Sequence, residues 1–148
     1  MMGSPFLSET SLTFLKPRLK KGLRPVAAKL AAFGVTANQV TLASLAGSLA
    51  VGGLLCARPS HTALFALLPV WLPVRTACAA IDGTLAIEFG QKSRLGGILN
   101  EAGDIASDMA LFFPLALVVP FSLSSVLPVM ALSALSEVAG IAGKKNGR

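Results

Sequence analysis

The sequence predicts an all-α integral membrane protein: a helical bundle of about four transmembrane helices, preceded by an amphipathic interfacial helix. Three observations predict this fold class. The 148 residues are 53% hydrophobic and only 14% charged, with a mean hydropathy of +0.71, whereas soluble domains are about a quarter charged. Long apolar stretches follow one another, separated by short polar loops. The basic residues precede the first apolar stretch or gather in alternate loops, as in chains that cross a bilayer repeatedly.

The N-terminal segment, residues 1–37, has the pattern of a helix that lies on a membrane. Residues 10–33 mix basic and apolar side chains at roughly helical spacing, and Pro17, Gly22 and Pro25 interrupt this pattern. We therefore expect a broken amphipathic helix against anionic headgroups. A solvated basic arm is the alternative interpretation.

Residues 38–148 are expected to form the transmembrane domain. A turn precedes it, with Thr36 or Asn38 as the cap of its first helix. Each predicted span approaches the length of about 20 residues that a bilayer requires; they cover 40–57, 63–87, 95–119 and 126–143.

Small residues and cysteines in these spans allow two further expectations. Gly47, Gly52 and Gly53 in the first span indicate close packing between helices. Cys56 and Cys78 both fall in apolar runs, so we expect thiols inside the bundle rather than a disulfide.

The charge distribution predicts the topology. The net charge of +6 could indicate nucleic-acid binding, but the positions of the charges indicate a membrane surface instead. Basic residues lie before the first span, in the second loop and in the tail, whereas Arg58 is alone in the opposite loops. Both termini and the 88–94 loop are therefore predicted to be cytoplasmic. The basic residues on that side are Lys16, Arg18, Lys20, Lys21, Arg24, Lys29, Lys92, Arg94, Lys144, Lys145 and Arg148.

Acidic and amide side chains are concentrated on the second and third spans. Asn100, Asp104 and Asp108 repeat every four residues and share one helix face, which Glu101 flanks. Asp108 lies about 20 Å along the helix from Leu95, at a depth where a charge is costly unless a wet or liganded cavity receives it. Asp82 can face this stretch if the two spans are adjacent. Oxygen ligands of this kind suit magnesium, commonly together with phosphates.

The surroundings of Asp82 leave room for a bulky ligand, since residues 77–86 are nearly all small. Arg75 lies seven residues before Asp82 and on the same face. It could neutralise a carboxylate or contact a ligand phosphate, and both readings stay open. Helix packing explains Gly83 and Gly96, taken one at a time, as well as ligand contact does.

The run from "DGTLA" (82–86) to "GGILNEAGD" (96–104) resembles the signature of the CDP-alcohol phosphatidyltransferase family, D-x-x-D-G-x-x-A-R followed by G-x-x-x-D-x-x-x-D. The run "VTANQVTLASLAG" (35–47) resembles the family's entry into its first span. The resemblance covers roughly residues 15–140 and is strongest to a bacterial branch that carries Asn at the third acid position. The positions that match are Asp82, Gly83, Ala86, Gly96 and Asp104.

The resemblance implies a membrane phosphotransferase of phospholipid biosynthesis. Such enzymes transfer a phosphatidyl group from a CDP-linked lipid, such as CDP-diacylglycerol, to a small acceptor alcohol and release CMP. Asp104 would be the catalytic base. Substrate contacts would come from Asp82, Gly83, Ala86 and Gly96. Magnesium or manganese would be held by Asp82, Asn100 and Asp104, with Glu101 and Asp108 as further ligands. A bacterial cytoplasmic (inner) membrane location and a possible homodimer also follow from the resemblance.

Departures from the signature keep other functions open. Ala79 stands at the first acid position, Asn100 at the third, and Ile87 at the arginine. Members of the family have six spans, so we expect this chain to lack the last two, as a fragment or a divergent member. A catalytically inactive protein with the family fold is one alternative. A small transporter that uses its intramembrane acids is another, and a polar seam that stabilises a bundle is a third.

Overall fold

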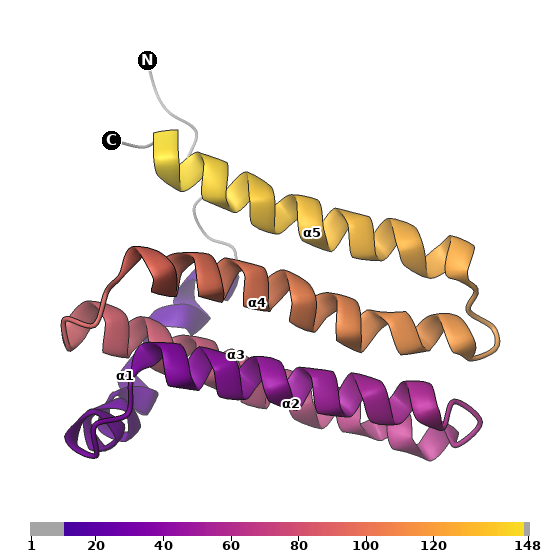
Figure 1. Ribbon diagram of the computed structural model, residues 1–148, viewed down its shortest axis with the longest axis horizontal. Coiled ribbons are helices and arrows are strands. Elements are labelled where there is room, and N and C mark those ends of the chain that lie inside the picture. The colour runs from indigo at the N-terminus through magenta and orange to yellow at the C-terminus, as the bar shows by residue number, and fades with distance from the viewer. Residues whose placement is uncertain (1–10, 147–148) are drawn as a thin grey trace.

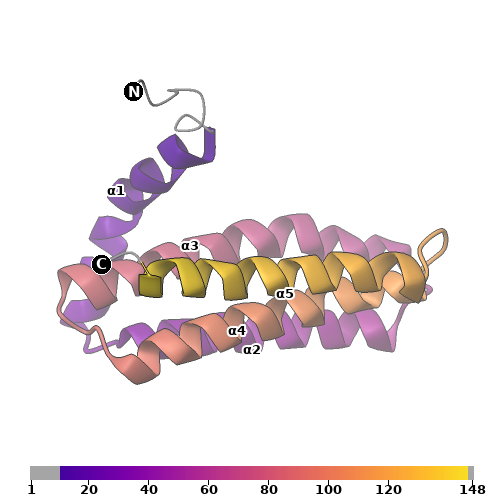
Figure 2. The ribbon, with the colours of Figure 1, turned by 90° about the horizontal axis from the view of Figure 1, so that it is seen from above.

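The computed structural model describes residues 11–146, all of whose regular elements are helical. In chain order they are α1 (Ser11–Ala32), α2 (Ala37–Ala57), η2 (Thr62–Ala66), α3 (Leu67–Glu88), α4 (Arg94–Phe112), η3 (Phe113–Leu117) and α5 (Leu123–Asn146). Helices α2 to α5 run alongside one another as a bundle, and α1 leaves one end of it at a steep angle (Figures 1 and 2). The predicted all-α bundle with a preceding helix is confirmed.

α1 is continuous, so the expectation of a broken helix was wrong. It runs from Ser11 to Ala32 through Pro17, Gly22 and Pro25 without an interruption. Tertiary packing compensates for the weak local propensity. The apolar side of α1, which includes the fully buried Ala27, packs on Ile81 and Leu85 of α3. This contact holds α1 against the bundle. Its basic residues that the structure describes are exposed: Arg18, Lys20, Lys21, Arg24 and Lys29.

α2 is the helix around which α3 and α4 are arranged, since it packs against both. Thr36 caps it: its hydroxyl accepts the amide of Gln39, and the Gln39 side chain accepts the amide of Thr36. Close approach occurs at two of the three predicted glycines. A Cβ at Gly47 would overlap the Trp71 ring, and one at Gly52 would overlap the backbone carbonyl of Ala110, whereas Gly53 has open space.

The surface of the bundle is suited to lipid. Within residues 11–146, two helices are long and apolar enough to cross a membrane, Ala37–Ala57 and Thr62–Glu88, and few of their residues are buried inside the protein. A soluble core helix would bury them, so lipid is their natural surrounding. α4 fails the same test because Arg94, Glu101, Asp104 and Asp108 lie in it; α5 has its apolar stretch over Leu123–Ser136.

One end of the bundle collects the segments that the charge pattern assigns to the cytoplasm. The start of α2, the end of α3, the start of α4 and the C-terminal end of α5 all lie at this end, next to α1 (Figure 1). We call it the basic end. Its orientation in a membrane stays a prediction, as does the division of the chain after residue 37. Cys56 and Cys78 are free thiols, as expected, although both are only partly buried.

Candidate functional site

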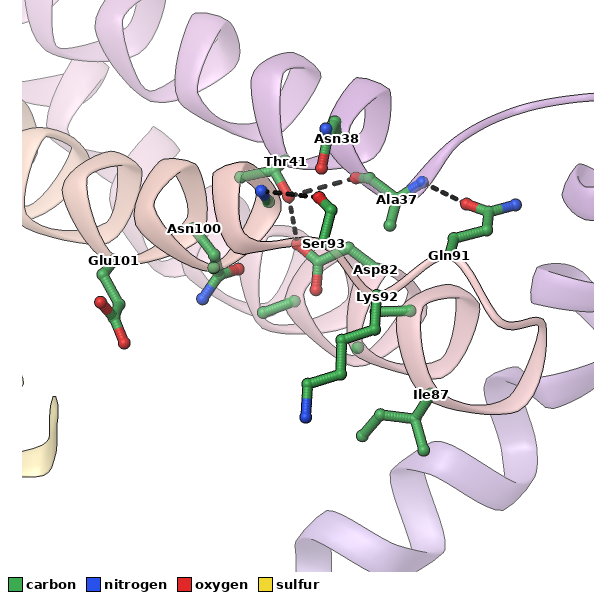
Figure 3. A pocket seen from close by; sticks show the side chains of 15 residues that line it. Ala37, Asn38, Thr41, Asp82, Ile87, Gln91, Lys92, Ser93, Asn100 and Glu101 are labelled. Carbon is green, nitrogen blue, oxygen red and sulfur yellow. Dashed lines mark hydrogen bonds between the residues drawn. The ribbon is translucent and has the colours of Figure 1, made fainter. Parts of the chain in front are cut away.

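A cavity of about 300 Å³ lies at the basic end of the bundle. Helices α2, α3 and α4 and the loop between α3 and α4 each contribute to its wall (Figure 3). The residues that line it are Ala37, Asn38, Thr41, Ala79, Asp82, Gly83, Ala86, Ile87, Gln91, Lys92, Ser93, Gly96, Gly97, Asn100 and Glu101. Most of the residues predicted from the two halves of the sequence signature are therefore brought to one place.

Asp82 is the buried carboxylate of this cavity. Its residue is only 7% exposed, although it lines the cavity wall. The Thr41 hydroxyl on α2 lies 2.8 Å from Asp82 Oδ2 and 3.1 Å from the carbonyl oxygen of Ala37. A hydroxyl compensates a buried charge only in part, because burial of an ion requires an opposite charge or several donors. Asp82 is thus suited to a cation.

Gly83 and Gly96 differ in what the structure requires of them. A Cβ at Gly83 would meet nothing within 4 Å, so packing does not explain this glycine, and its place in the cavity wall does. A Cβ at Gly96 would lie 2.7 Å from Asn38 Oδ1 and 2.9 Å from Ser93 Oγ. Ser93 is the N-cap of α4 and accepts the amide of Gly96 at 2.9 Å, so close approach contributes there.

Asn100 connects the cavity to Asp104, one turn deeper. The Asn100 side-chain nitrogen lies 3.4 Å from Asp104 Oδ2. Asn100 and Glu101 line the cavity, with the Glu101 carboxylate on the far side of Asn100 from Asp82 (Figure 3). Asp104 and Asp108 do not line it.

Arg75 holds the two deeper acids. Its Nη1 donates to Asp108 Oδ1 at 2.6 Å, and its Nη2 donates to Asp104 Oδ1 at 2.9 Å and to the Asp104 carbonyl at 3.0 Å. Ser133 of α5 donates to the second oxygen of Asp108. The resulting cluster of Arg75, Asp104, Asp108 and Ser133, here called the arginine cluster, links α3, α4 and α5. Of the two readings left open for Arg75, neutralisation of carboxylates is the one observed.

The second and third spans were expected to face each other directly, but in the structure α2 packs against both of them. Both α3 and α4 pack on α2, and between them the arginine cluster supplies the described polar contacts. α2 therefore contributes Thr41 and Asn38 to a site that the sequence predicted from α3 and α4 alone. Gln91 is a further residue that the sequence did not single out: it accepts the Ala37 amide at 2.7 Å and donates to the Val35 carbonyl at 3.3 Å.

Oxygen donors for a hard cation are present, but they are not a dense acidic cluster. Across residues 11–146, no group of three His, Cys, Asp or Glu side chains lies close enough to hold a metal. Asp82 and Asn100 both line the cavity, and the Asn100 amide lies 3.4 Å from the Asp104 carboxylate outside it. Carboxylate and amide oxygens are the ligands that magnesium takes, often with waters and substrate phosphates in the remaining positions. The residues present therefore fit a magnesium ion that a phosphate ligand completes.

Comparison with known proteins gives two relatives. The chain is 42% identical over 127 residues to the inner membrane protein YnbA of Escherichia coli (strain K12), which covers 86% of this chain and 63% of that protein. It is 30% identical over 109 residues to an archaetidylinositol phosphate synthase of Pyrococcus horikoshii, covering 72% of this chain and 54% of that one. No family model matches the chain, and no solved structure matches it significantly.

These relatives agree with the fold and limit what can be carried over. One is a membrane protein by name and the other a phosphate synthase, and the matches span 63% of the length of the first and 54% of the second. The similarity to an inner membrane protein, together with the apolar helices of the bundle, identifies the chain as an integral membrane protein.

Proposed function

We propose that this chain belongs to the CDP-alcohol phosphatidyltransferase family and transfers a phosphatidyl group from a CDP-alcohol, such as CDP-diacylglycerol, to an acceptor alcohol. The cavity is the observation that carries the proposal. It brings Asp82, Gly83 and Ala86 of α3 together with Gly96 and Asn100 of α4, the two separated halves of the signature. The similarity to a phosphate synthase supports the same chemistry.

Asp82, Asn100 and Asp104 would hold magnesium or manganese, with Glu101 and Asp108 as the outer candidates. The metal would neutralise the diphosphate of the CDP-alcohol, as bound cations do in phosphoryl transfer. Asp108 is the weakest of these ligands, because Arg75 and Ser133 contact both of its oxygens. The buried Asp82 is the strongest, because it lines the cavity and the described partner of its Oδ2 is a neutral hydroxyl.

The transfer itself requires a base and a fixed geometry. Asp104 Oδ2, on the side of Asn100, would accept the proton of the acceptor hydroxyl. The alcohol oxygen then forms a bond to the lipid-side phosphorus, and the bond from that phosphorus to the oxygen of CMP breaks, so that CMP leaves. Arg75 fixes Asp104 through Oδ1, and the other oxygen, Oδ2, lies 3.4 Å from the side-chain nitrogen of Asn100, which lines the cavity. Positioning of this kind supplies much of the rate enhancement in such reactions.

The position of the cavity suits an amphiphilic substrate. The polar residues of the cavity lie on the helix ends and the loop at the basic end of the bundle, which is the predicted cytoplasmic interface. Ile87, 67% exposed, presents an apolar side chain at the cavity wall. A nucleotide–lipid could place its headgroup in the cavity while its acyl chains remain in the bilayer beside α3. A homodimer is part of the same proposal.

A catalytically inactive binding protein is the second candidate. Ala79 and Ile87 favour it, because both line the cavity where the family signature has an acid and an arginine. A transporter has less support. Such a protein is expected to carry ionisable side chains that can bind and release its ion, whereas Asp104 and Asp108 both contact Arg75.

Replacement of the proposed base separates catalysis from binding. We predict that Asp104→Asn lowers CMP release from CDP-diacylglycerol by about 10²-fold or more, because a general base contributes at least this much. The assay uses the purified chain with magnesium and, in turn, glycerol phosphate, inositol phosphate and serine as acceptors. Thermal unfolding of the variant checks that it is folded.

Glu88→Gln is the matched control for that experiment. Glu88 is an acid of α3 outside the cavity lining, in an exposed ion pair with Arg24 at 2.7 Å. Its CMP release should equal that of the wild type. Equal release by Asp104→Asn would remove the proposed base, whereas magnesium-dependent binding without release by any chain would favour the inactive binding protein.

A further inference from the structure

Lys92 is the cationic side chain of the cavity. It lies in the loop between α3 and α4, and no other lysine or arginine is among the lining residues. Figure 3 shows its side chain between Asp82 and Ile87 in that view, with its amine directed away from Asp82. It is exposed, and its amine makes no ion pair with any residue of the described chain.

The two carboxylates that line the cavity, Asp82 and Glu101, form no ion pair with Lys92. Asp82 is contacted by the Thr41 hydroxyl, and the Glu101 carboxylate lies beyond Asn100 (Figure 3). Lysines on solvated surfaces are commonly unpaired, but this one stands at the wall of a concave site that also has oxygen donors for a cation. A cation and a metal site on one cavity together suit a phosphate-bearing ligand.

Ile87 explains why such a cation is needed. It occupies the position where the family signature has an arginine, and it lines the same cavity as Lys92. The chain therefore has an apolar side chain at the signature's arginine position and a cation on the loop that follows. Lys92 follows Ile87 by five positions in sequence, and the fold brings both side chains to one wall (Figure 3).

We propose that Lys92 binds the diphosphate of the nucleotide–lipid and replaces the cation missing at Ile87. This inference rests on the proposed function, because it names a contact of the same ligand. Lys92 would act as a binding residue: its ammonium donates to phosphate oxygens and takes no part in proton transfer. A charge-assisted hydrogen bond of this kind is stronger than a neutral one.

The test measures binding of CDP-diacylglycerol to the full chain in detergent with excess magnesium, as a titration of thermal stabilisation. Lys92→Gln should weaken binding by about tenfold, the effect of one charge-assisted hydrogen bond. Arg94→Gln is the matched control, because Arg94 lies two residues away, is exposed and does not line the cavity. Its loss of charge should change binding by less than about twofold, since exposed charges are screened in salt.

A rescue variant distinguishes a contact from a structural effect. Ile87→Arg introduced into Lys92→Gln restores a cation at the same wall and should recover most of the lost affinity. Phosphatidylglycerol serves as a second probe, because it carries a lipid phosphate without the nucleotide diphosphate. Its weaker effect on the thermal unfolding temperature should be the same for the wild type and for Lys92→Gln.

The outcomes separate the inference from the function on which it rests. Wild-type binding that Lys92→Gln leaves unchanged, or that Arg94→Gln weakens equally, would overturn the role of Lys92 while the cavity keeps its function. A Lys92 effect on phosphatidylglycerol as large as that on CDP-diacylglycerol would also overturn it, in favour of general lipid contact. Absence of any wild-type binding would overturn the proposed function and the inference together.

Discussion

The cavity and the arginine cluster use the same kind of residue in opposite ways. In the cluster, Asp104 and Asp108 share Arg75, and Ser133 satisfies the remaining oxygen of Asp108. In the cavity, Asp82 is more deeply buried, but its described side-chain partner is the Thr41 hydroxyl and glycines and alanines line the wall around it. The fold supplies a cation to Asp108 and to Oδ1 of Asp104, whose Oδ2 lies near Asn100 of the cavity, whereas the described salt bridges give Asp82 no cation.

This difference shows how to separate a structural acid from a binding acid in a membrane bundle. Each intramembrane carboxylate is costly until something neutralises it. Where a guanidinium is within hydrogen-bond distance, the fold supplies the compensation and removal of a partner should cost stability. Where small residues keep space beside the acid, the compensation must come from a ligand, and removal of the acid should cost binding instead.

The largest expected effect comes from Arg75→Ala. Removing the guanidinium leaves Asp104 and Asp108 without their cation at sites where Arg75 and Asp108 are only 17% and 16% exposed. We expect a loss of about 3 kcal/mol in the free energy of unfolding, as for other broken buried pairs. Thermal or denaturant unfolding in detergent measures it.

Arg58→Ala is the control for that variant. Arg58 is exposed in the loop at the other end of the bundle, outside the described salt bridges, so its replacement should change stability little. An equally small effect of Arg75→Ala would show that the arginine cluster is not structural, and the contrast with the cavity would no longer hold.

Gly83→Ala is expected to change the free energy of unfolding less than Arg75→Ala does, and in the stabilising direction. An added Cβ meets nothing within 4 Å, and alanine gains about 1 kcal/mol over glycine within a helix. The unliganded variant should therefore be as stable as the wild type or more so. Its binding of CDP-diacylglycerol should weaken, because the methyl group occupies the cavity wall. Gly52→Ala, which would overlap the Ala110 carbonyl, should lose stability in the same assay.

Much of the fold could be predicted because hydropathy and charge act locally along the chain. The predicted spans agree with α2, α3 with η2, α4 with η3, and α5, and Thr36 is the cap of α2. The continuity of α1 could not be predicted. Pro17 and Pro25 weaken a helix locally, and only the packing of Ala27 and its neighbours on α3 outweighs this.

The candidate site was predictable where it depends on helical spacing. Asp82, Gly83 and Ala86 share a face of α3, and Gly96 and Asn100 share a face of α4, so one cavity can receive both sets. Thr41 could not be assigned to it, because the order of packing places α2 beside both helices and no local pattern encodes that order. The partner of Arg75 was left open for the same reason, since it depends on how α3 and α4 are rotated.

The most direct test of the central claim is the thermal stabilisation of the wild-type chain and of Asp82→Asn by CDP-diacylglycerol, with magnesium and after chelation. We predict stabilisation of the wild type that chelator removes, no such stabilisation of Asp82→Asn, and an unfolding temperature of the unliganded variant at least equal to that of the wild type. Glu88→Gln should behave as the wild type. Undiminished, magnesium-dependent stabilisation of Asp82→Asn would contradict the assignment of the cavity as the site of the metal and the nucleotide–lipid.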